Sequence, residues 1–324
     1  MARLGILSDI HYAGLGEQAR GDDYEYRDLA NPATRRLLHW YRNYVWLRSP
    51  LRQNHLLDRF LDRAGPSGFD WVIANGDYSC DSGFVGVSDE AACQSARECL
   101  EKLRGKFGAR FRAIYGDHEL GKASFLGKRG GMRLLSWQRA RQELKLVPFW
   151  QFEIGNYVLM GIVSSLIALP AFAADALPSE IEEWQRLRGE HLTEVRSAFA
   201  ALRPNQRVLL FCHDPTALPY LRQEEAVESK LPQIEQTVIG HLHSELILWK
   251  SRLLAGMPQV RFLGHSATRM SGALNQAKQW RPFHVRLCPA LSGIELLKDG
   301  GYCTLELDPE ARQPLHFHRL RLPR

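Results

Sequence analysis

The stretch ILSDIH, residues 6–11, ends an apolar run with an acid, Asp9, and an imidazole, His11. Side chains two positions apart on a strand point to the same face of a sheet, so both groups can reach one metal ion. A carboxylate together with a neutral imidazole suits manganese, iron or zinc better than calcium. The stretch therefore predicts a buried strand with two metal ligands at its carboxyl end.

Four further apolar runs along the chain also end in polar residues. In α/β sheets the carboxyl ends of neighbouring strands meet in one crevice, where ligands bind. A glycine just after a strand lets the chain turn sharply and lets the backbone approach an ion or anion. The runs are 71–75, before Gly76-Asp77; 111–115, before Gly116-Asp117-His118-Glu119; 207–212, before His213-Asp214; and 236–239, before Gly240-His241-Leu242-His243.

The five motifs, in this order, resemble those of the calcineurin-like metallophosphoesterase superfamily, over about residues 3 to 250. That resemblance implies an α/β fold of two stacked mixed β-sheets flanked by α-helices, with two metal ions at one end. It implies that Asp9, His11 and His243 bind the first metal, that Asp77 bridges both, that Asp117, His213 and His241 bind the second, and that His118 lies beside the scissile phosphate with Glu119 as its orienting partner.

Known chemistry of two-metal sites explains what these residues would do. Two divalent ions about 3.5–4 Å apart repel each other, and a bridging carboxylate such as Asp77 offsets the repulsion. A water shared by the ions loses a proton near neutral pH and attacks phosphorus as a metal-bridged hydroxide. His118 would protonate the leaving oxygen or stabilise equatorial charge. We expect two divalent ions, manganese first, with iron, zinc, nickel or cobalt as alternatives.

One residue departs from the family pattern, which has asparagine where this chain has Asp117. An aspartate can bind a metal, but it lacks the amide N–H that an asparagine could donate to phosphate, and it adds negative charge beside the substrate. At ~5 Å and an effective dielectric constant of ~20, the repulsion is on the order of 3 kcal/mol. Asp117 therefore predicts an attenuated enzyme, an engineered variant or a different metal balance.

Basic and aromatic residues alternate in two segments, 122–137 and 269–281. This combination is typical of grooves for nucleic-acid strands, where cations meet phosphates and rings meet bases. A solvated helix face with core aromatics is the alternative. Lys122 and Arg129 in the first segment are candidate substrate contacts, and so is His265, which follows the apolar stretch 260–264.

Composition and net charge indicate the kind of partner, the number of domains and the compartment. The net charge of +6 and the estimated pI of about 9.0 favour a polyanionic partner. With 324 residues, 45% of them hydrophobic, the chain can form one domain over 1–324. Six cysteines without C-x-x-C spacing, no apolar run of ~20 residues and no room for a secretory signal predict a cytoplasmic protein without membrane contact.

Between the motifs, apolar spacing predicts helices at 88–103, 131–144 and 179–202, and two helices in 31–62, interrupted at Pro50. Two or three strands are expected after Gly264, among 283–288, 302–307 and 315–322, and we expect 264–324 to complete the second sheet. Whether 166–188 forms a lid stays open.

The leading prediction is a metal-dependent phosphodiesterase that acts on DNA or nucleotide diesters, with no organic cofactor. A phosphomonoesterase, or a pyrophosphohydrolase acting on a nucleotide or lipid head group, would use the same chemistry on another substrate. A non-catalytic module that binds anions through its metals is the third possibility, and Asp117 is the residue that favours it.

Overall fold

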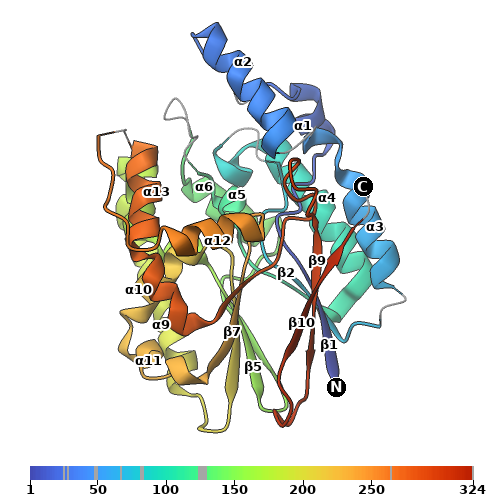
Figure 1. Ribbon diagram of the computed structural model, residues 1–324, viewed down its shortest axis with the longest axis vertical. Helices are drawn as coiled ribbons and strands as arrows, with labels where there is room; N and C mark the ends of the chain where they lie inside the picture. Colours follow the sequence, from blue (N-terminus) through green and yellow to red (C-terminus); the bar gives the residue numbers. More distant parts are fainter. Residues whose placement is uncertain are drawn as a thin grey trace.

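Ten strands of the described chain form two five-stranded sheets that pack on each other (Figure 1). The computed structural model describes residues 1–24, 26–27, 29–46, 50–65, 68–80, 84–122, 130–262 and 265–322, and only the backbone of residues 265 and 266.

Both sheets are mixed. The first has the order β10-β9-β1-β2-β3, in which β1 to β3 are parallel and β9 and β10 are antiparallel to their neighbours. The second has the order β4-β5-β6-β7-β8, in which β4 alone is antiparallel. The predicted sandwich is therefore confirmed. The strands are β1 (Ala2–Leu7), β2 (Trp71–Ala74), β3 (Phe111–Ala113), β4 (Trp150–Ile154), β5 (Tyr157–Ile162), β6 (Arg207–Cys212), β7 (Ile234–Ile239), β8 (Val285–Leu287), β9 (Gly301–Leu307) and β10 (His316–Arg321).

The central strands are apolar at successive positions because both of their faces are buried. On β6, Leu209 and Phe211 lie in the core between the two sheets. Val208 and Leu210 of the same strand point the other way, into the core beneath the helices. A strand covered on both faces needs apolar side chains at every position, which is why the motifs follow continuous hydrophobic runs.

Helices cover the outer face of each sheet. Helix α4 is preceded by Asp89, whose side chain accepts a capping hydrogen bond from the Ala92 N–H at 3.0 Å, and is followed by Gly108, whose φ is +56°. The helices predicted at 88–103, 131–144 and 179–202 are confirmed as α4, α6 and α9. The α-helices are α1 (Leu15–Arg20), α2 (Pro32–Tyr41), α3 (Asn54–Ala64), α4 (Glu90–Phe107), α5 (Asp117–Leu120), α6 (Leu134–Gln142), α7 (Ser164–Ile167), α8 (Leu169–Phe172), α9 (Ile181–Ala200), α10 (Leu218–Arg222), α11 (Glu225–Glu228), α12 (Glu245–Leu253) and α13 (His265–Gln276).

The two helices predicted in 31–62 are present as α2 and α3, but only α3 packs in the hydrophobic core. A π-helical turn, η1 (Arg42–Trp46), follows α2 directly. Helix α2 has no buried residue. It projects from the body of the molecule at the top of Figure 1.

The prediction that 264–324 completes the second sheet is wrong for two of its three strands. Only β8 joins that sheet, beside β7. β9 pairs antiparallel with β1 in the first sheet, and β10 pairs with β9. Leu305 and Leu307 of β9 lie in the core between the sheets, so β9 buries its apolar face and also covers the edge of β1.

Three residues of the segment 166–188, whose role as a lid was open, are part of the core. Leu166, Ile167 and Leu169 are buried, at 0%, 0% and 3% exposure. They pack in the hydrophobic clusters beneath the helices, so this part of the segment belongs to the body of the fold.

The six cysteines are buried, and none forms a disulfide in the described chain. Among the described helices, none combines the length and the apolar composition that a membrane span requires.

Candidate metal centre

The loops that follow β1, β2, β6 and β7 are hydrogen-bonded to one another. The Asp9 N–H donates to the Gly76 carbonyl at 3.1 Å, and the His241 N–H donates to the Asp9 carboxylate at 3.0 Å. The ring Nδ1 of His213 is 2.6 Å from the Asn75 carbonyl. These contacts bring the predicted ligands from distant parts of the sequence into one cluster.

Asp9, His11 and His243 form the first half of this cluster. The two histidine Nε2 atoms are 3.4 Å apart, and His243 Nε2 is 3.3 Å from Asp9 Oδ1. All three residues are buried. The resemblance assigned these three residues to one metal.

Asp117, His213 and His241 form the second half. Asp117 Oδ1 is 3.2 Å from His213 Nε2 and 3.2 Å from His241 Nδ1. Asp77 lies between the halves: its Oδ2 is 3.2 Å from His213 Nε2, and its ligand atoms also fall within 4.8 Å of those of Asp9 and His11. This position is the one a bridging carboxylate requires.

The spacing of these atoms fits divalent ions. Two ligand atoms that each lie about 2.1 Å from one ion are roughly 3.0–3.4 Å apart. The closest contacts within each half, 3.2–3.4 Å, fall in this range. Asp77 Oδ2 is buried and accepts no hydrogen bond within the described residues, so it is available to an ion. The donor set of carboxylate oxygens and imidazole nitrogens is the one that manganese, iron and zinc accept.

Backbone carbonyls orient two of the histidines. His213 Nδ1 lies 2.6 Å from the Asn75 carbonyl, and His11 Nδ1 lies 3.3 Å from the Ser79 carbonyl. A carbonyl only accepts, so each Nδ1 carries the proton and each Nε2 presents its lone pair to the cluster. This is the tautomer that a metal ligand needs.

The backbone of the ligand loops is strained. Five of the ten non-glycine residues with positive φ in the described chain belong to the cluster, and each such conformation costs roughly 1–3 kcal/mol. Hydrogen bonds between the loops hold this conformation. Residues in strained conformations gather at functional sites because the surrounding fold must hold them there. The five are Asp9, His11, Asp77, His241 and His243.

Two of the predicted glycines are required for close approach. A Cβ on Gly76, whose φ is +93°, would lie 2.7 Å from His213 Nδ1. A Cβ on Gly240 would lie 2.0 Å from Ser8 Oγ and 2.6 Å from Asp9 Oδ2. Both glycines therefore let ligand loops pack at distances that any side chain would prevent.

The Asp117 half of the cluster stabilises positive charge. Burial lowers the pKa of His241, but the carboxylates of Asp214 and Asp117 outweigh burial and raise it to about 9. Burial and Asp117 raise the pKa of Asp77, but His213 and His118 more than offset them and hold it well below its ordinary value. Buried carboxylates of this kind favour a cation beside them, whether a proton or a metal ion.

His118 lies beside the cluster, but Glu119 does not orient it. The His118 ring is 4.7 Å from the His11 ring, and its Nδ1 is buried without a hydrogen-bond partner in the described chain. Glu119 instead accepts backbone N–H bonds from Gly116, Asp77 and Tyr78, at 2.7, 3.0 and 2.8 Å. The predicted pairing is therefore wrong, because the Glu119 carboxylate binds the loops that hold Asp77 and His118.

Lys122 offsets the extra charge of Asp117. Its Nζ lies 3.0 Å from Asp117 Oδ2, the oxygen not turned toward the histidines. Both side chains are partly withdrawn from solvent, with 31% and 10% of their surface exposed. The negative charge that distinguishes Asp117 from an asparagine is thus balanced within the site.

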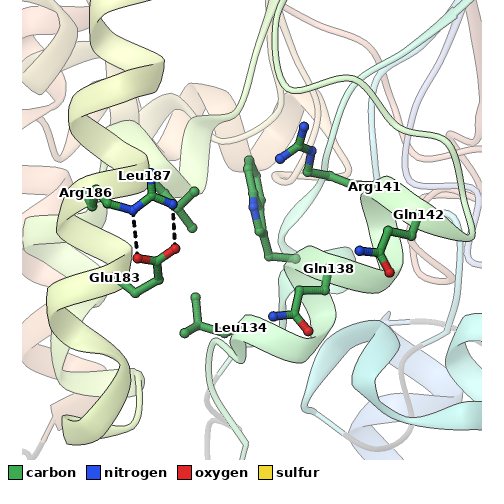
Figure 2. Close-up of a pocket in the computed structure, with 8 residues that line it drawn as sticks. Leu134, Gln138, Arg141, Gln142, Glu183, Arg186 and Leu187 are labelled. Carbon is green, nitrogen blue, oxygen red and sulfur yellow. Dashed lines mark hydrogen bonds and ion pairs between the residues drawn. The ribbon is translucent and has the colours of Figure 1, made fainter.

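Two of the predicted substrate contacts fall on parts of the chain that the structure does not describe. Arg129 and the His265 side chain lie outside the described residues. Trp137 and Trp280, two of the three rings expected in nucleic-acid grooves, are buried in the hydrophobic core, and the third, Phe125, lies outside the described residues. A hollow between α6 and α9 is lined by none of the predicted site residues. Figure 2 shows the Glu183–Arg186 ion pair on its wall.

Sequence reasoning missed Trp46 at the first half of the cluster. The centroid of its indole ring lies 5.1 Å from that of the His243 ring. The two residues are 197 positions apart in the sequence, and the apolar spacing of 31–62 indicated only helices. No signal in the sequence links Trp46 to the last motif.

A comparison with protein-family models bears on the residues of this cluster. The family model for calcineurin-like phosphoesterases matches residues 2–245, which contain all seven predicted ligands. Among solved structures, the chain is similar to a dimetal phosphatase from Danio rerio, LOC 393393, with 13% sequence identity, a TM-score of 0.46, and coverage of 94% of this chain and 92% of that one. No curated protein matches the sequence. This chain belongs to the calcineurin-like phosphoesterase family.

Proposed function

We propose that this chain is a metal-dependent phosphodiesterase that hydrolyses nucleic-acid or nucleotide diesters, DNA included. The observation that carries the proposal is the convergence of imidazole nitrogens and carboxylate oxygens from five loops at 3.2–3.4 Å. This donor set suits two divalent ions, and manganese is the proposed metal.

Each half of the cluster would hold one ion. Asp9, His11 and His243 are the proposed ligands of the first, and Asp117, His213 and His241 of the second, with Asp77 shared. Bound there, the ions supply Lewis acidity for a water and for the phosphate oxygens. The strained loops around them keep the ligands in place without rearrangement.

His118 is proposed to donate a hydrogen bond to the substrate as a neutral imidazole. Burial and the nearby Lys122 lower the pKa of His118 to about 3, and two divalent ions would lower it further. A neutral imidazole donates an N–H bond to a phosphoryl oxygen but has no extra proton to give. Of the two roles expected for His118, stabilising equatorial charge therefore fits better than protonating the leaving oxygen.

A diester is favoured over a monoester by charge. A monoester dianion carries one more negative charge than a diester. Lys122 is already paired with Asp117, so it adds little net positive charge for that second charge. The same pairing weakens the case for a non-catalytic module, which depended on Asp117. The overall charge of +6 supports a nucleic acid or nucleotide, and the buried cysteines without disulfides support a reducing compartment such as the cytoplasm.

The test compares bis(p-nitrophenyl) phosphate with p-nitrophenyl phosphate, with the protein stripped of metal and then given Mn²⁺. We expect metal-dependent release of p-nitrophenolate, faster from the diester. Faster release from the monoester would overturn the diester assignment in favour of a phosphomonoesterase. Binding of Mn²⁺ without release of p-nitrophenolate from either ester would favour the hypothesis of a non-catalytic anion-binding module.

A further inference from the structure

An aromatic row connects helix α2 to the first half of the metal centre. The ring of Trp46 lies on His243, with 5.1 Å between centroids and 32° between ring planes. Tyr41, at the end of α2, is nearly parallel to Trp46, with 6.4 Å between centroids and 15° between planes. The row therefore leads from a proposed metal ligand to an exposed helix.

Hydrogen bonds fix Trp46 relative to the centre. The Val45 and Trp46 carbonyls accept backbone N–H bonds from Leu296 and Glu295, at 3.2 and 2.8 Å. Ala290, a few residues before Glu295, is in turn bonded to a ligand loop. Its N–H donates to the His243 carbonyl at 3.1 Å. The π-helical turn that carries Trp46 is a geometry often found at functional sites.

The row remains accessible although it borders a buried centre. Trp46 is partly exposed, and Tyr41 is 43% exposed. Trp40 and Tyr44, on or just after α2, are 54% and 65% exposed. Of these rings, Trp46 and Tyr41 are the ones in line with His243, and rings left unburied beside a binding centre favour contact with a ligand over a role in folding.

We infer that Trp46 and Tyr41 form a stacking subsite for a nucleobase of the substrate, in which the base of the nucleotide whose phosphate lies at the metal centre packs on the part of the two rings that stays exposed. The inference rests on the proposed function and narrows its substrate to base-bearing phosphoesters. Flat rings bind bases of any sequence because every base has a π-face. A ring in contact with a proposed metal ligand places such a base one nucleoside away from the phosphate.

The experiment compares two diesters that share the p-nitrophenyl leaving group, the p-nitrophenyl ester of thymidine 5′-phosphate and methyl p-nitrophenyl phosphate. In the wild type we expect the thymidine ester to have the higher kcat/KM. In Trp46→Leu the ratio of the two kcat/KM values should fall about tenfold, mostly through the KM of the thymidine ester. Tyr41→Leu should lower the ratio less, and Trp46→Phe should retain most of it.

Two exposed tryptophans serve as matched controls. Trp40→Leu removes a ring from α2, and Trp249→Leu removes one from α12, where Trp249 is 57% exposed. We expect both variants to keep the wild-type ratio. A loss as large in Trp40→Leu as in Trp46→Leu would show a general effect of hydrophobic surface and would overturn the assignment.

Binding gives a readout independent of turnover. Thymidine 5′-monophosphate should quench tryptophan emission saturably in the Mn²⁺-loaded wild type, and the Trp46→Leu variant should lose most of this quenching. Metal content, measured by elemental analysis, should equal the wild-type value in that variant.

The failures of the two proposals are distinguishable. Equal losses on both esters in Trp46→Leu, or no saturable quenching in the wild type, would overturn the stacking subsite and leave the hydrolase intact. The absence of saturable quenching in the wild type would overturn the subsite even if the Trp46→Leu variant does not fold. If the wild type with Mn²⁺ hydrolyses neither ester, the proposed function fails as well.

Discussion

The two halves of the metal centre share their ligand chemistry but differ in their surroundings. The aromatic half, Asp9 with His11 and His243, borders Trp46, whose ring lies on His243. The charged half, Asp117 with His213 and His241, borders Lys122, 3.0 Å from Asp117. The proposed centre would thus offer a planar ligand an aromatic ring at one half and would offer an anion a balanced charge at the other.

The largest expected effect comes from the residue common to both halves. Asp77→Ala removes the shared carboxylate, so we expect the loss of both ions and a fall in kcat/KM of at least ~10³-fold. Elemental analysis and the aryl phosphate assay measure the two effects. Asp58→Ala, which changes an exposed aspartate of α3, is the control. Retention of two ions by Asp77→Ala would contradict a shared ligand.

Single-ligand variants should separate the halves. His243→Gln in the aromatic half and His213→Gln in the charged half should each bind about one ion per chain where the wild type binds two. Activity should fall by roughly 10²-fold or more in both. The ion count per chain is the decisive measurement, since loss of both ions from either variant would mean that the halves do not bind metal separately.

Charge balance in the charged half can be tested by a double-mutant cycle. Lys122→Met leaves the Asp117 charge uncompensated beside an anionic substrate, so kcat/KM should fall about tenfold. In an Asp117→Asn background the same change should cost less than about threefold, and Asp117→Asn alone should have a small effect. Additive effects would mean that the ion pair does not offset Asp117. A large gain in Asp117→Asn alone would instead support an attenuated enzyme.

The smallest effect concerns the stability of the metal-free protein. The pKa of His241 is raised to about 9, so the folded protein holds a proton that the unfolded chain releases near its ordinary value of 6.5. The resulting stabilisation is complete below pH ~6.5 and is lost as the pH rises through about 9. Thermal unfolding in EDTA should show a Tm that declines over this window, and His241→Gln should flatten the decline. An unchanged slope in that variant would assign the dependence to another group.

The convergence of the five motifs at one end of the sheets could be predicted from the sequence. Buried parallel strands are recognisable in the sequence as apolar runs. Ligands that directly follow such runs lie together, because the carboxyl ends of parallel strands meet at one edge of a sheet. Asp9 and His241 are 232 positions apart, yet this rule brings them within hydrogen-bonding distance. The prediction worked because local patterning and sheet geometry agree at these positions.

Features that depend on tertiary pairing could not be predicted. Nothing in the apolar pattern of β9 tells whether its partner is β1 or a strand of the second sheet. The Glu119 carboxylate accepts three backbone N–H bonds. Every residue except proline has a backbone N–H, so the sequence does not indicate which ones a carboxylate will bind. Trp137 and Trp46 are the same residue type, but one stacks on Tyr115 in the core and the other borders the metal centre. Only the folded chain distinguishes them.

The position of β1 has a consequence for biosynthesis. This first strand is paired with β2 on one side and with β9, about 300 residues later, on the other. A nascent chain therefore emerges with an unpaired β1 edge that stays open until β9 has left the ribosome. Messages that stop before β9 should yield aggregation-prone products even though they encode all seven proposed ligands.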